Sequence, residues 1–237
     1  MKIAVIPARG GSKRIPRKNI KVFGGRPIIA WSIAAAWESR CFDRIVVSTD
    51  DPEIASVALE FGAETPFLRP SEISGDMTPT VSVMRHAIAE MSAQGYAPDD
   101  VCCLYATAPF VRAEDIVRGA AALAAAPDAY VFPVTTFAFP IQRALLRDAD
   151  GRVRMLNPDL FATRSQDLPE TWHDAGQFYW ASARTWMSRD AVFSGETVGI
   201  AHPRHRVQDI DTLEDWVVAE RLFEIDQAHR APVVSIP

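Results

Sequence analysis

Short apolar runs alternate with amphipathic segments over the first 135 residues of the chain. Apolar runs of strand length lie at 3–7, 44–48, 101–106 and 129–134. Apolar residues recur at helical spacing within 27–37, 52–62, 80–93 and 113–126. Fully apolar runs of this length are typical of buried strands, and their alternation with helices is typical of a parallel sheet. The pattern therefore predicts an α/β fold in which helices flank a mostly parallel sheet.

The alternation stops after residue 135 and resumes at residue 196. The segment between them contains Pro140, Pro158 and Pro169, a predicted hairpin around 148–151, and an aromatic group: Trp172, Phe178, Tyr179, Trp180 and Trp186. Aromatic residues are enriched in protein interfaces. We therefore interpret 136–195 as an insertion that makes a homodimer and helps to line a binding site. Its candidate interface residues are Phe139, Trp172 and Trp186.

The remainder of the chain is expected to complete the α/β domain, which would comprise 1–135 and 196–229. Its last elements are predicted to be an extended segment at 205–210 and a helix at 212–228. The final segment, 230–237, is expected to be a frayed tail.

Composition narrows the function classes. The chain has 237 residues, 48% of them apolar, and a formal net charge of −5. No apolar run approaches the roughly 18 residues needed to cross a bilayer, and the chain starts directly with a predicted strand. The three cysteines have no C-x2-C spacing, which favours buried thiols in a reducing compartment. We therefore expect a cytoplasmic protein with neither membrane nor nucleic-acid partners.

A cationic loop follows the first predicted strand. Residues 8–26 contain four glycines, seven lysines or arginines and no carboxylate. Glycines expose backbone N–H groups and cations supply charge, so the loop is typical of a phosphate site. The alternative is a solvated basic surface or a nonspecific nucleic-acid contact. The loop is not an ATPase P-loop, because Arg14 stands after Lys13, nor is it a G-x-G-x-x-G motif.

A pair of carboxylates near the other end of the chain is the second candidate site. If 206–211 is extended, Asp209 and Asp211 point to the same face, as Mg²⁺ ligands would. The alternative is that Asp211 or Thr212 is a helix N-cap answered by a carboxylate three residues later. The two interpretations are compatible. Because ligands of open α/β sheets bind at the carboxyl ends of the strands, the cationic loop and this pair together predict nucleotidyl or phosphoryl transfer.

Five motifs carry a resemblance to a known family. The sequences IPARGGSKRIPRKN (6–19), VSTDD (47–51), LRPSEISGD (68–76), ATAPF (106–110) and DIDT (209–212) resemble those of the CMP–acylneuraminate synthetases. The resemblance extends over about residues 1–225. It implies a nucleotide-diphospho-sugar transferase (Rossmann-like) fold with an inserted dimerisation segment, CTP as the nucleotide, Mg²⁺ as cofactor and a nine-carbon sugar acid as acceptor.

The resemblance also implies roles for individual residues. It assigns Asp209 and Asp211 to the metal, and these two with Arg9 and Lys18 to catalysis. The nucleotide-binding candidates are Ala8, Arg9, Gly10, Gly11, Ser12, Lys18, Asn19 and Arg69. The sugar-binding candidates are Tyr105, Thr107, Arg143, Arg164, Gln166, His173, Asp174, Gln177 and Tyr179.

One departure from the family pattern bears on the sugar. Tyr105 stands where the sialic acid enzymes have glutamine, which disfavours N-acetylneuraminic acid. The 139–145 and 163–180 stretches look like the branch that activates pseudaminic acid, so this sugar is the expected acceptor. Legionaminic and N-acetylneuraminic acid are the alternatives. A more distant alternative is a non-enzymatic nucleotide- or nucleic-acid-binding module that uses the loop only for its charge.

Overall fold

A mixed seven-stranded sheet lies at the centre of the structure, a computed structural model that describes residues 1–230. The strands are ordered β11-β6-β10-β5-β1-β4, and β9 pairs with β6 outside this path. Their bounds are β1 Lys2–Pro7, β4 Arg44–Ser48, β5 Asp100–Leu104, β6 Tyr130–Thr136, β9 Trp172–Asp174, β10 Phe178–Ser182 and β11 Thr197–Ala201. Two small hairpins pair β2 (Val22–Phe23) with β3 (Arg26–Pro27) and β7 (Leu145–Arg147) with β8 (Val153–Met155).

Most strands of the sheet run in one direction. β1 is parallel to β4 and β5, with Ile3 opposite Arg44 and Val101, and β11 is parallel to β6. β10 is antiparallel to both β5 and β6, and β9 is antiparallel to β6. Thus β4, β1, β5, β6 and β11 share a direction, and their carboxyl ends meet at one edge. The predicted mostly parallel sheet is confirmed.

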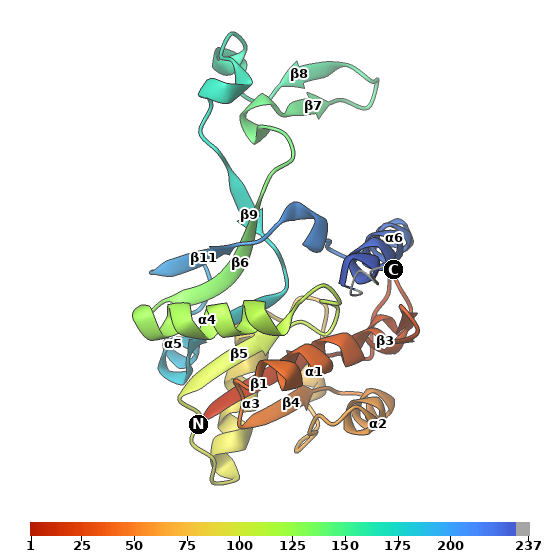
Figure 1. The fold of residues 1–237 in the computed structure, drawn as a ribbon, viewed down its shortest axis with the longest axis vertical. Coiled ribbons are helices and arrows are strands. Elements are labelled where there is room, and N and C mark those ends of the chain that lie inside the picture. The colour runs from red at the N-terminus through yellow and green to blue at the C-terminus, as the bar shows by residue number, and fades with distance from the viewer. Residues whose placement is uncertain (231–237) are drawn as a thin grey trace, which may run out of the picture.

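Helices cover both faces of the sheet (Figure 1). Their bounds are α1 Ile28–Ser39, α2 Pro52–Glu60, α3 Thr80–Ala93, α4 Ala113–Ala125, α5 Ala183–Ser188 and α6 Leu213–Arg230. Buried residues of α1, α2 and α4 pack with one side of the strands, including Ile6, Val47 and Trp180. Residues of α3 and α5 pack with the other side, where Val5 and Cys103 lie. Each face of the sheet therefore has its own apolar core.

Local chemistry explains where two of the helices lie. The Asp51 carboxylate accepts hydrogen bonds from the backbone N–H groups of Glu53 and Ile54, at 2.9 and 3.1 Å, so α2 begins at Pro52 as the sequence predicted. On α4, a Cβ at Gly119 would lie 2.8 Å from Nε1 of Trp180. Only glycine lets this helix approach β10 so closely.

The last helix closes over the cationic loop. Trp216, Ala219 and Phe223 of α6 are buried against Ile15 and Phe23 in a third apolar cluster. The ring centroids of Phe23 and Trp216 lie 5.3 Å apart in an edge-to-face contact. This packing fixes the loop after β1 relative to the chain segment that precedes α6.

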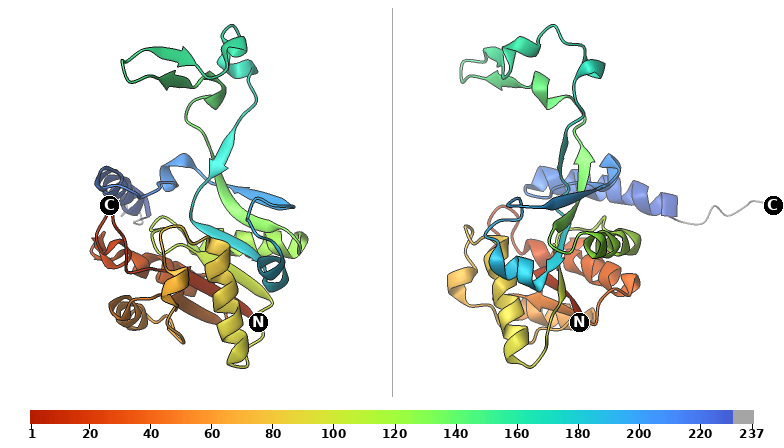
Figure 2. Two further views of the ribbon diagram at one scale, coloured as in Figure 1. Left: turned by 180° about the vertical axis from the view of Figure 1, so that it is seen from behind. Right: turned by 90° about the vertical axis from the view of Figure 1, so that its left-hand side faces the viewer.

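An arm projects from the α/β body. It comprises residues 137–171, leaves the sheet after β6, carries the β7–β8 hairpin and returns at β9, as all three views show (Figures 1 and 2). Many of its apolar side chains are exposed, and Phe139 is 83% exposed. The projecting part is shorter than the expected 136–195 insertion, because β9 and β10 belong to the central sheet.

Two predictions from the sequence fail. Trp186 is fully buried inside the protomer, where its Nε1 donates to the carbonyl of Val101 at 3.1 Å, so it is not an interface residue. The extended segment expected at 205–210 is also wrong: a short 3-10 helix covers Arg204–Arg206, and residues 207–211 are irregular. Of the predicted tail, Arg230 ends α6 and 231–237 lie outside the described residues. Within residues 1–230, no helix is long and apolar enough to cross a membrane.

Candidate active site

Two adjoining cavities lie at the edge of the sheet where the parallel strands end. Cavity A has a volume of about 320 Å³, and its lining includes Arg9, Ser12, Lys18, Asn19, Arg69 and Asp76. Cavity B has a volume of about 540 Å³, and its lining includes His173, Asp174, Tyr179, Val207, Gln208 and Asp209. Tyr105 and Thr107 line both, so the cavities share a wall. This edge is where ligands bind in open α/β sheets.

The loop after β1 forms one side of cavity A. The Asn19 side-chain amide donates to the carbonyl of Arg9 at 2.9 Å, and the Gly10 N–H donates to the carboxylate of Asp50 at 3.0 Å. A Cβ at Gly10 would lie 2.9 Å from that of Asp51, so glycine is needed for this close approach. The loop therefore brings four predicted nucleotide-binding residues to the cavity: Arg9, Ser12, Lys18 and Asn19. The other three candidates of this loop, Ala8, Gly10 and Gly11, shape its backbone. Ala8 is buried, and its N–H donates to the Ser48 carbonyl at 3.0 Å.

A buried arginine faces the loop across cavity A. Arg69 is 5% exposed, its Nε donates to Ser74 Oγ at 3.1 Å, and its guanidinium lies 3.7 Å from Asp50. Burial lowers the pKa of this guanidinium, and the negative charge of Asp50 opposes the shift. A cation held in a partly desolvated wall attracts an anion more strongly than an exposed cation does. Arg69 thus suits a phosphate ligand.

Asp76 pairs with two cations of the loop. Its carboxylate contacts the guanidinium of Arg9 and lies 2.6 Å from Nζ of Lys13. Hydrogen bonds from Lys13 and then Arg9 lower the pKa of Asp76. An arginine guanidinium binds carboxylate and phosphate oxygens with similar geometry, so the contact shows that Arg9 is placed to bind an oxyanion.

The carboxylate pair lies beside the same loop. Asp211 lies 2.9 Å from a guanidinium nitrogen of Arg14 and 3.4 Å from Nζ of Lys18. Desolvation, and then the negative charge of Asp211, raise the pKa of Asp209, although this side chain remains exposed enough for solvent to screen the effect. Two oxygen ligands whose charges repel each other favour a hard dication between them. Within residues 1–230, no group of three or more His, Cys, Asp or Glu side chains could hold a metal.

Helix capping does not use the carboxylate of Asp211. The Thr212 hydroxyl accepts from the N–H of Asp215 at 3.2 Å, and the Asp215 carboxylate accepts from the N–H of Thr212 at 2.7 Å. This is a reciprocal capping box at the start of α6. The capping alternative therefore applies to Thr212 and Asp215. The same-face arrangement expected from an extended 206–211 is wrong, because 207–211 is irregular, but the two carboxylates are close enough for the charge of Asp211 to raise the pKa of Asp209.

Cavity B has an aromatic and hydroxyl-rich wall. The Tyr105 hydroxyl lies 3.2 Å from Thr80 Oγ1, and the Tyr179 hydroxyl donates to the carboxylate of Asp174. Burial raises the pKa of Tyr105 to about 12 and also raises that of Tyr179. Both phenols are thus neutral hydrogen-bonding groups at physiological pH. The two rings pack together, with centroids 5.4 Å apart, and both line cavity B, so the wall has apolar surface as well.

The structure brings only some of the predicted sugar-binding residues together. Tyr105, Thr107, His173, Asp174 and Tyr179 line cavity B. The other four lie elsewhere. Three of them, Arg143, Arg164 and Gln166, belong to the exposed part of the arm. There Arg143 donates to Ser165 Oγ at 3.2 Å, and Arg164 donates to the carboxylate of Asp167 at 2.7 Å. Gln177 is 3% exposed, and its amide donates to the carbonyl of Arg206 at 2.6 Å.

Sequence reasoning missed several residues of cavity A. Asp76, Ser74 and Thr80 line it, and Asp50 braces both the loop and Arg69. Asp50 and Asp76 lie within the VSTDD and LRPSEISGD motifs, but charge alone does not suggest that a carboxylate belongs to a phosphate site. Asp50 follows the predicted strand 44–48 at the edge of the sheet where ligands bind, which is a signal for a site residue, whereas Asp76 lies inside a polar loop that no local pattern marks.

Comparison with known proteins identifies the family. Residues 3–176 match the family model described as cytidylyltransferase. The chain belongs to the cytidylyltransferase family. One relative is the pseudaminic acid cytidylyltransferase of Campylobacter jejuni subsp. jejuni serotype O:2, which is 40% identical over 94% of this chain and 97% of its own length. Another is the CMP-N,N'-diacetyllegionaminic acid synthase of Legionella pneumophila, which is 32% identical over 95% and 97%.

Solved structures support the fold of this cytidylyltransferase. CMP:2-keto-3-deoxy-manno-octonic acid synthetase complexed with CTP superposes with a TM-score of 0.68, at 16% identity, over 95% of this chain and 99% of that one. A 4-diphosphocytidyl-2C-methyl-D-erythritol synthase gives 0.64 at 14% identity, over 94% and 97%. These likenesses establish the nucleotidyltransferase fold that the sequence resemblance implied.

Proposed function

We propose that this cytidylyltransferase transfers the cytidylyl group of CTP to the anomeric hydroxyl of pseudaminic acid, giving CMP-pseudaminic acid and pyrophosphate. The observation that carries the proposal is the shared wall of the two cavities. Cavity A has the cations that a triphosphate requires, and cavity B, beyond Tyr105 and Thr107, has room for a sugar acid. The similarity to the Campylobacter jejuni enzyme supports the choice of sugar.

The reaction is a single in-line displacement. The anomeric oxygen forms a bond to the α-phosphorus of CTP, the bond from this phosphorus to the α–β bridging oxygen breaks, and the hydroxyl proton is released. Negative charge then increases on the departing pyrophosphate. Arg9, Lys18 and Arg69 would hold the triphosphate and stabilise that charge, while Ser12 and Asn19 would orient it. Arg9 would exchange its Asp76 partner for phosphate oxygen.

Mg²⁺ is the proposed cofactor, held by Asp209 and Asp211. When bound, it would neutralise phosphate charge and align the reacting groups. The chain would contribute Asp209 from the lining of cavity B and Asp211 from a position 3.4 Å from Nζ of Lys18, which lines cavity A.

A homodimer formed through the arm is part of the proposal. Exposed apolar residues gather on the arm, among them Phe139, Leu145 and Phe161, together with the adjacent Trp172. Apolar surface of this kind is typical of an interface between copies of a chain. Because Arg143, Arg164 and Gln166 lie away from cavity B of their own chain, they would reach the sugar in the cavity of the partner. We propose a cytoplasmic dimer, since CTP is supplied there, without nucleic-acid or membrane partners.

Pyrophosphate release is the direct test. The purified protein would be incubated with Mg²⁺, CTP and, separately, pseudaminic, legionaminic or N-acetylneuraminic acid, and with UTP, GTP or ATP in place of CTP. We expect release with CTP and the highest kcat/KM with pseudaminic acid. No release with any sugar, combined with steeply salt-dependent binding to arbitrary DNA or RNA, would support the non-enzymatic alternative instead.

A further inference from the structure

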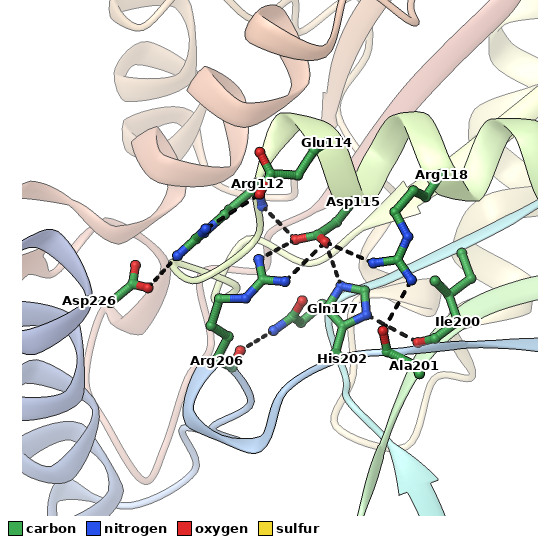
Figure 3. A network of polar contacts seen from close by, with 10 residues as sticks. All are labelled: Arg112, Glu114, Asp115, Arg118, Gln177, Ile200, Ala201, His202, Arg206 and Asp226. Atoms are coloured by element: carbon green, nitrogen blue, oxygen red, sulfur yellow. Dashed lines mark hydrogen bonds and ion pairs between the residues drawn. The ribbon is translucent and has the colours of Figure 1, made fainter. Parts of the chain in front are cut away.

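A buried network of charged side chains lies outside the site described above, where α4 meets the end of β11 and the 3-10 helix at Arg204–Arg206 (Figure 3). At its centre is Asp115 of α4, whose carboxylate is fully buried. Arg206 donates two hydrogen bonds to it, at 2.7 and 3.2 Å, and His202 Nε2 lies 3.1 Å away. Burial acts to raise the pKa of Asp115, but contacts with His202 and Arg206 outweigh it and lower the pKa to about 2. The network therefore contains a stable carboxylate anion.

Arg206 is the last residue of the 3-10 helix that precedes the irregular segment 207–211. A second contact holds its backbone, because the buried Gln177 amide donates to the Arg206 carbonyl at 2.6 Å. The carbonyl of Gln177 in turn accepts from the N–H of Tyr105 at 2.8 Å. A continuous path thus connects Asp115, Arg206 and Gln177 to Tyr105, on the shared wall of the cavities.

The segment that begins at Arg206 carries several groups of the site. Val207, Gln208 and Asp209 line cavity B, and Asp211 follows. Its far end is anchored, because Ile210 is buried and its carbonyl accepts from Lys18 Nζ at 2.7 Å. Its near end is anchored by Arg206. The three residues that line cavity B therefore lie between two anchored residues, Arg206 and Ile210.

We propose that Asp115 and Gln177 are positioning residues that act through Arg206, holding 207–211 so that Asp209 faces the sugar and the cation. The kinetic part of this inference rests on the proposed function, whereas the conformational part does not. Removing one partner of a buried ion pair leaves the other charge uncompensated, and the segment that carries it is then released toward solvent. Loss of the network is thus expected to misplace Asp209 while cavity A stays formed.

The test uses variants on each side of the ion pair. Asp115→Asn keeps the size of the side chain and removes its charge, and Arg206→Met removes the guanidinium. Arg206→Lys keeps the charge but loses the two-pronged contact. The control is Asp226→Asn, which breaks a second ion pair of the same region: Arg112, just before α4 and partly buried, lies 2.6 Å from the buried Asp226 of α6.

Two measurements distinguish positioning from simple stabilisation. For Asp115→Asn and Arg206→Met we expect amide hydrogen exchange of 207–211 to become at least about tenfold faster. We also expect kcat/KM for the sugar acid to fall at least about thirtyfold, with the Kd for CTP, measured without Mg²⁺, within about twofold of wild type and a partial recovery in Arg206→Lys. Asp226→Asn is expected to lower the melting temperature without either change.

Equal losses for CTP and the sugar, or unchanged exchange at 207–211, would overturn the inference. A wild-type protein that releases no pyrophosphate, but whose variants still show the faster exchange, would instead refute the proposed function and leave the conformational role of the network supported.

Discussion

The ammonium group of Lys18 lies 3.4 Å from the carboxylate of Asp211, although the two residues are 193 positions apart in the sequence. The contact joins the cationic loop after β1 to the segment before α6. Lys18 therefore lies between cavity A, which it lines, and the carboxylate pair proposed to hold Mg²⁺. The proposed chemistry needs the cationic loop and the carboxylate pair side by side, and the fold brings them together although they lie near opposite ends of the chain.

Neutralising either carboxylate should abolish most of the activity. For Asp209→Asn and Asp211→Asn we expect turnover to fall about 100-fold or more, because each change removes one charge from the proposed Mg²⁺ site. The measurement is kcat at increasing Mg²⁺ concentrations. A variant that keeps a near-wild-type rate at saturating Mg²⁺ would show that its carboxylate is not a ligand.

The same variants give a stability control. Because folding raises the pKa of Asp209, its ionised form is disfavoured in the native state at neutral pH, and the penalty disappears as the pH falls below the pKa of the unfolded state. Asp209→Asn should therefore leave the melting temperature of the metal-free protein at neutral pH unchanged or slightly raised. A large decrease would assign Asp209 a structural role.

The two cations that share Asp76 should differ in importance. Arg9 lines cavity A, whereas the side chain of Lys13 is 80% exposed. We expect Arg9→Ala to lose about 2–4 kcal/mol of transition-state stabilisation, read from kcat/KM, because it would face charge that develops on pyrophosphate. Lys13→Ala is the matched control and should change kcat/KM less than about threefold. Equal losses of kcat/KM in the two variants would mean that the total positive charge of the loop, and not the position of Arg9 in cavity A, determines triphosphate binding.

Much of the fold was predictable because local signals agreed with the tertiary structure. The apolar runs became β1, β4, β5 and β6, and the helix expected at 80–93 is α3, Thr80–Ala93. Asp51 followed by Pro52 marked the start of α2, and its capping bonds are present. The cationic loop was recognisable because glycines and like charges rarely gather without a ligand to hold them. These signals depend on neighbours in sequence alone.

The errors arose where distant contacts decide the structure. β10 is antiparallel within an otherwise parallel sheet, and no local pattern reveals its neighbours β5 and β6. Residues 207–211 lack strand pairing, although their sequence alternates like a strand, because Lys18 and Gln177 fix both ends. The motif predicted Gln177 to be a sugar ligand, whereas in the structure its side-chain amide donates to the backbone carbonyl of Arg206. Motifs indicated which residues matter but not what they contact.

The arm leads to a prediction about assembly. We expect a dimer of about twice 26.2 kDa by sedimentation at micromolar concentration, and we expect Phe139→Asp to shift it toward monomer, since a charge on the exposed apolar arm would be buried on association. A wild-type monomer with full activity would refute the dimer.

Mixed dimers test whether the arm serves the site of the partner. Arg164→Ala and Asp209→Asn should each be nearly inactive alone. Co-expressed, they should recover about a quarter of wild-type activity, because half of the dimers are mixed and each of these has one intact site. Arg152→Ala, which changes the hairpin of the same arm, is the control and should behave as wild type. No recovery on mixing would place Arg164 in the sugar site of its own chain, whereas full activity of Arg164→Ala alone would place it outside the sugar site.

The wall between the cavities should determine the sugar. Tyr105 and Tyr179 present rings to cavity B, and their hydroxyls are already engaged by Thr80 and Asp174. Such a lining favours the methyl terminus of a 9-deoxy sugar over a hydroxylated glycerol chain. An unpaired hydroxyl there would cost roughly 1–3 kcal/mol, or about tenfold to over a hundredfold in kcat/KM. Legionaminic acid has the same methyl terminus, so we expect N-acetylneuraminic acid to be the poorest acceptor of the three.

Tyr105→Gln should reduce the ratio of kcat/KM for pseudaminic acid to kcat/KM for N-acetylneuraminic acid by about tenfold, because an amide can pair with the extra hydroxyls. The measurement is pyrophosphate release. Equal or better use of N-acetylneuraminic acid by the wild-type enzyme would contradict the proposed acceptor, while the assignment to the cytidylyltransferase family would stand.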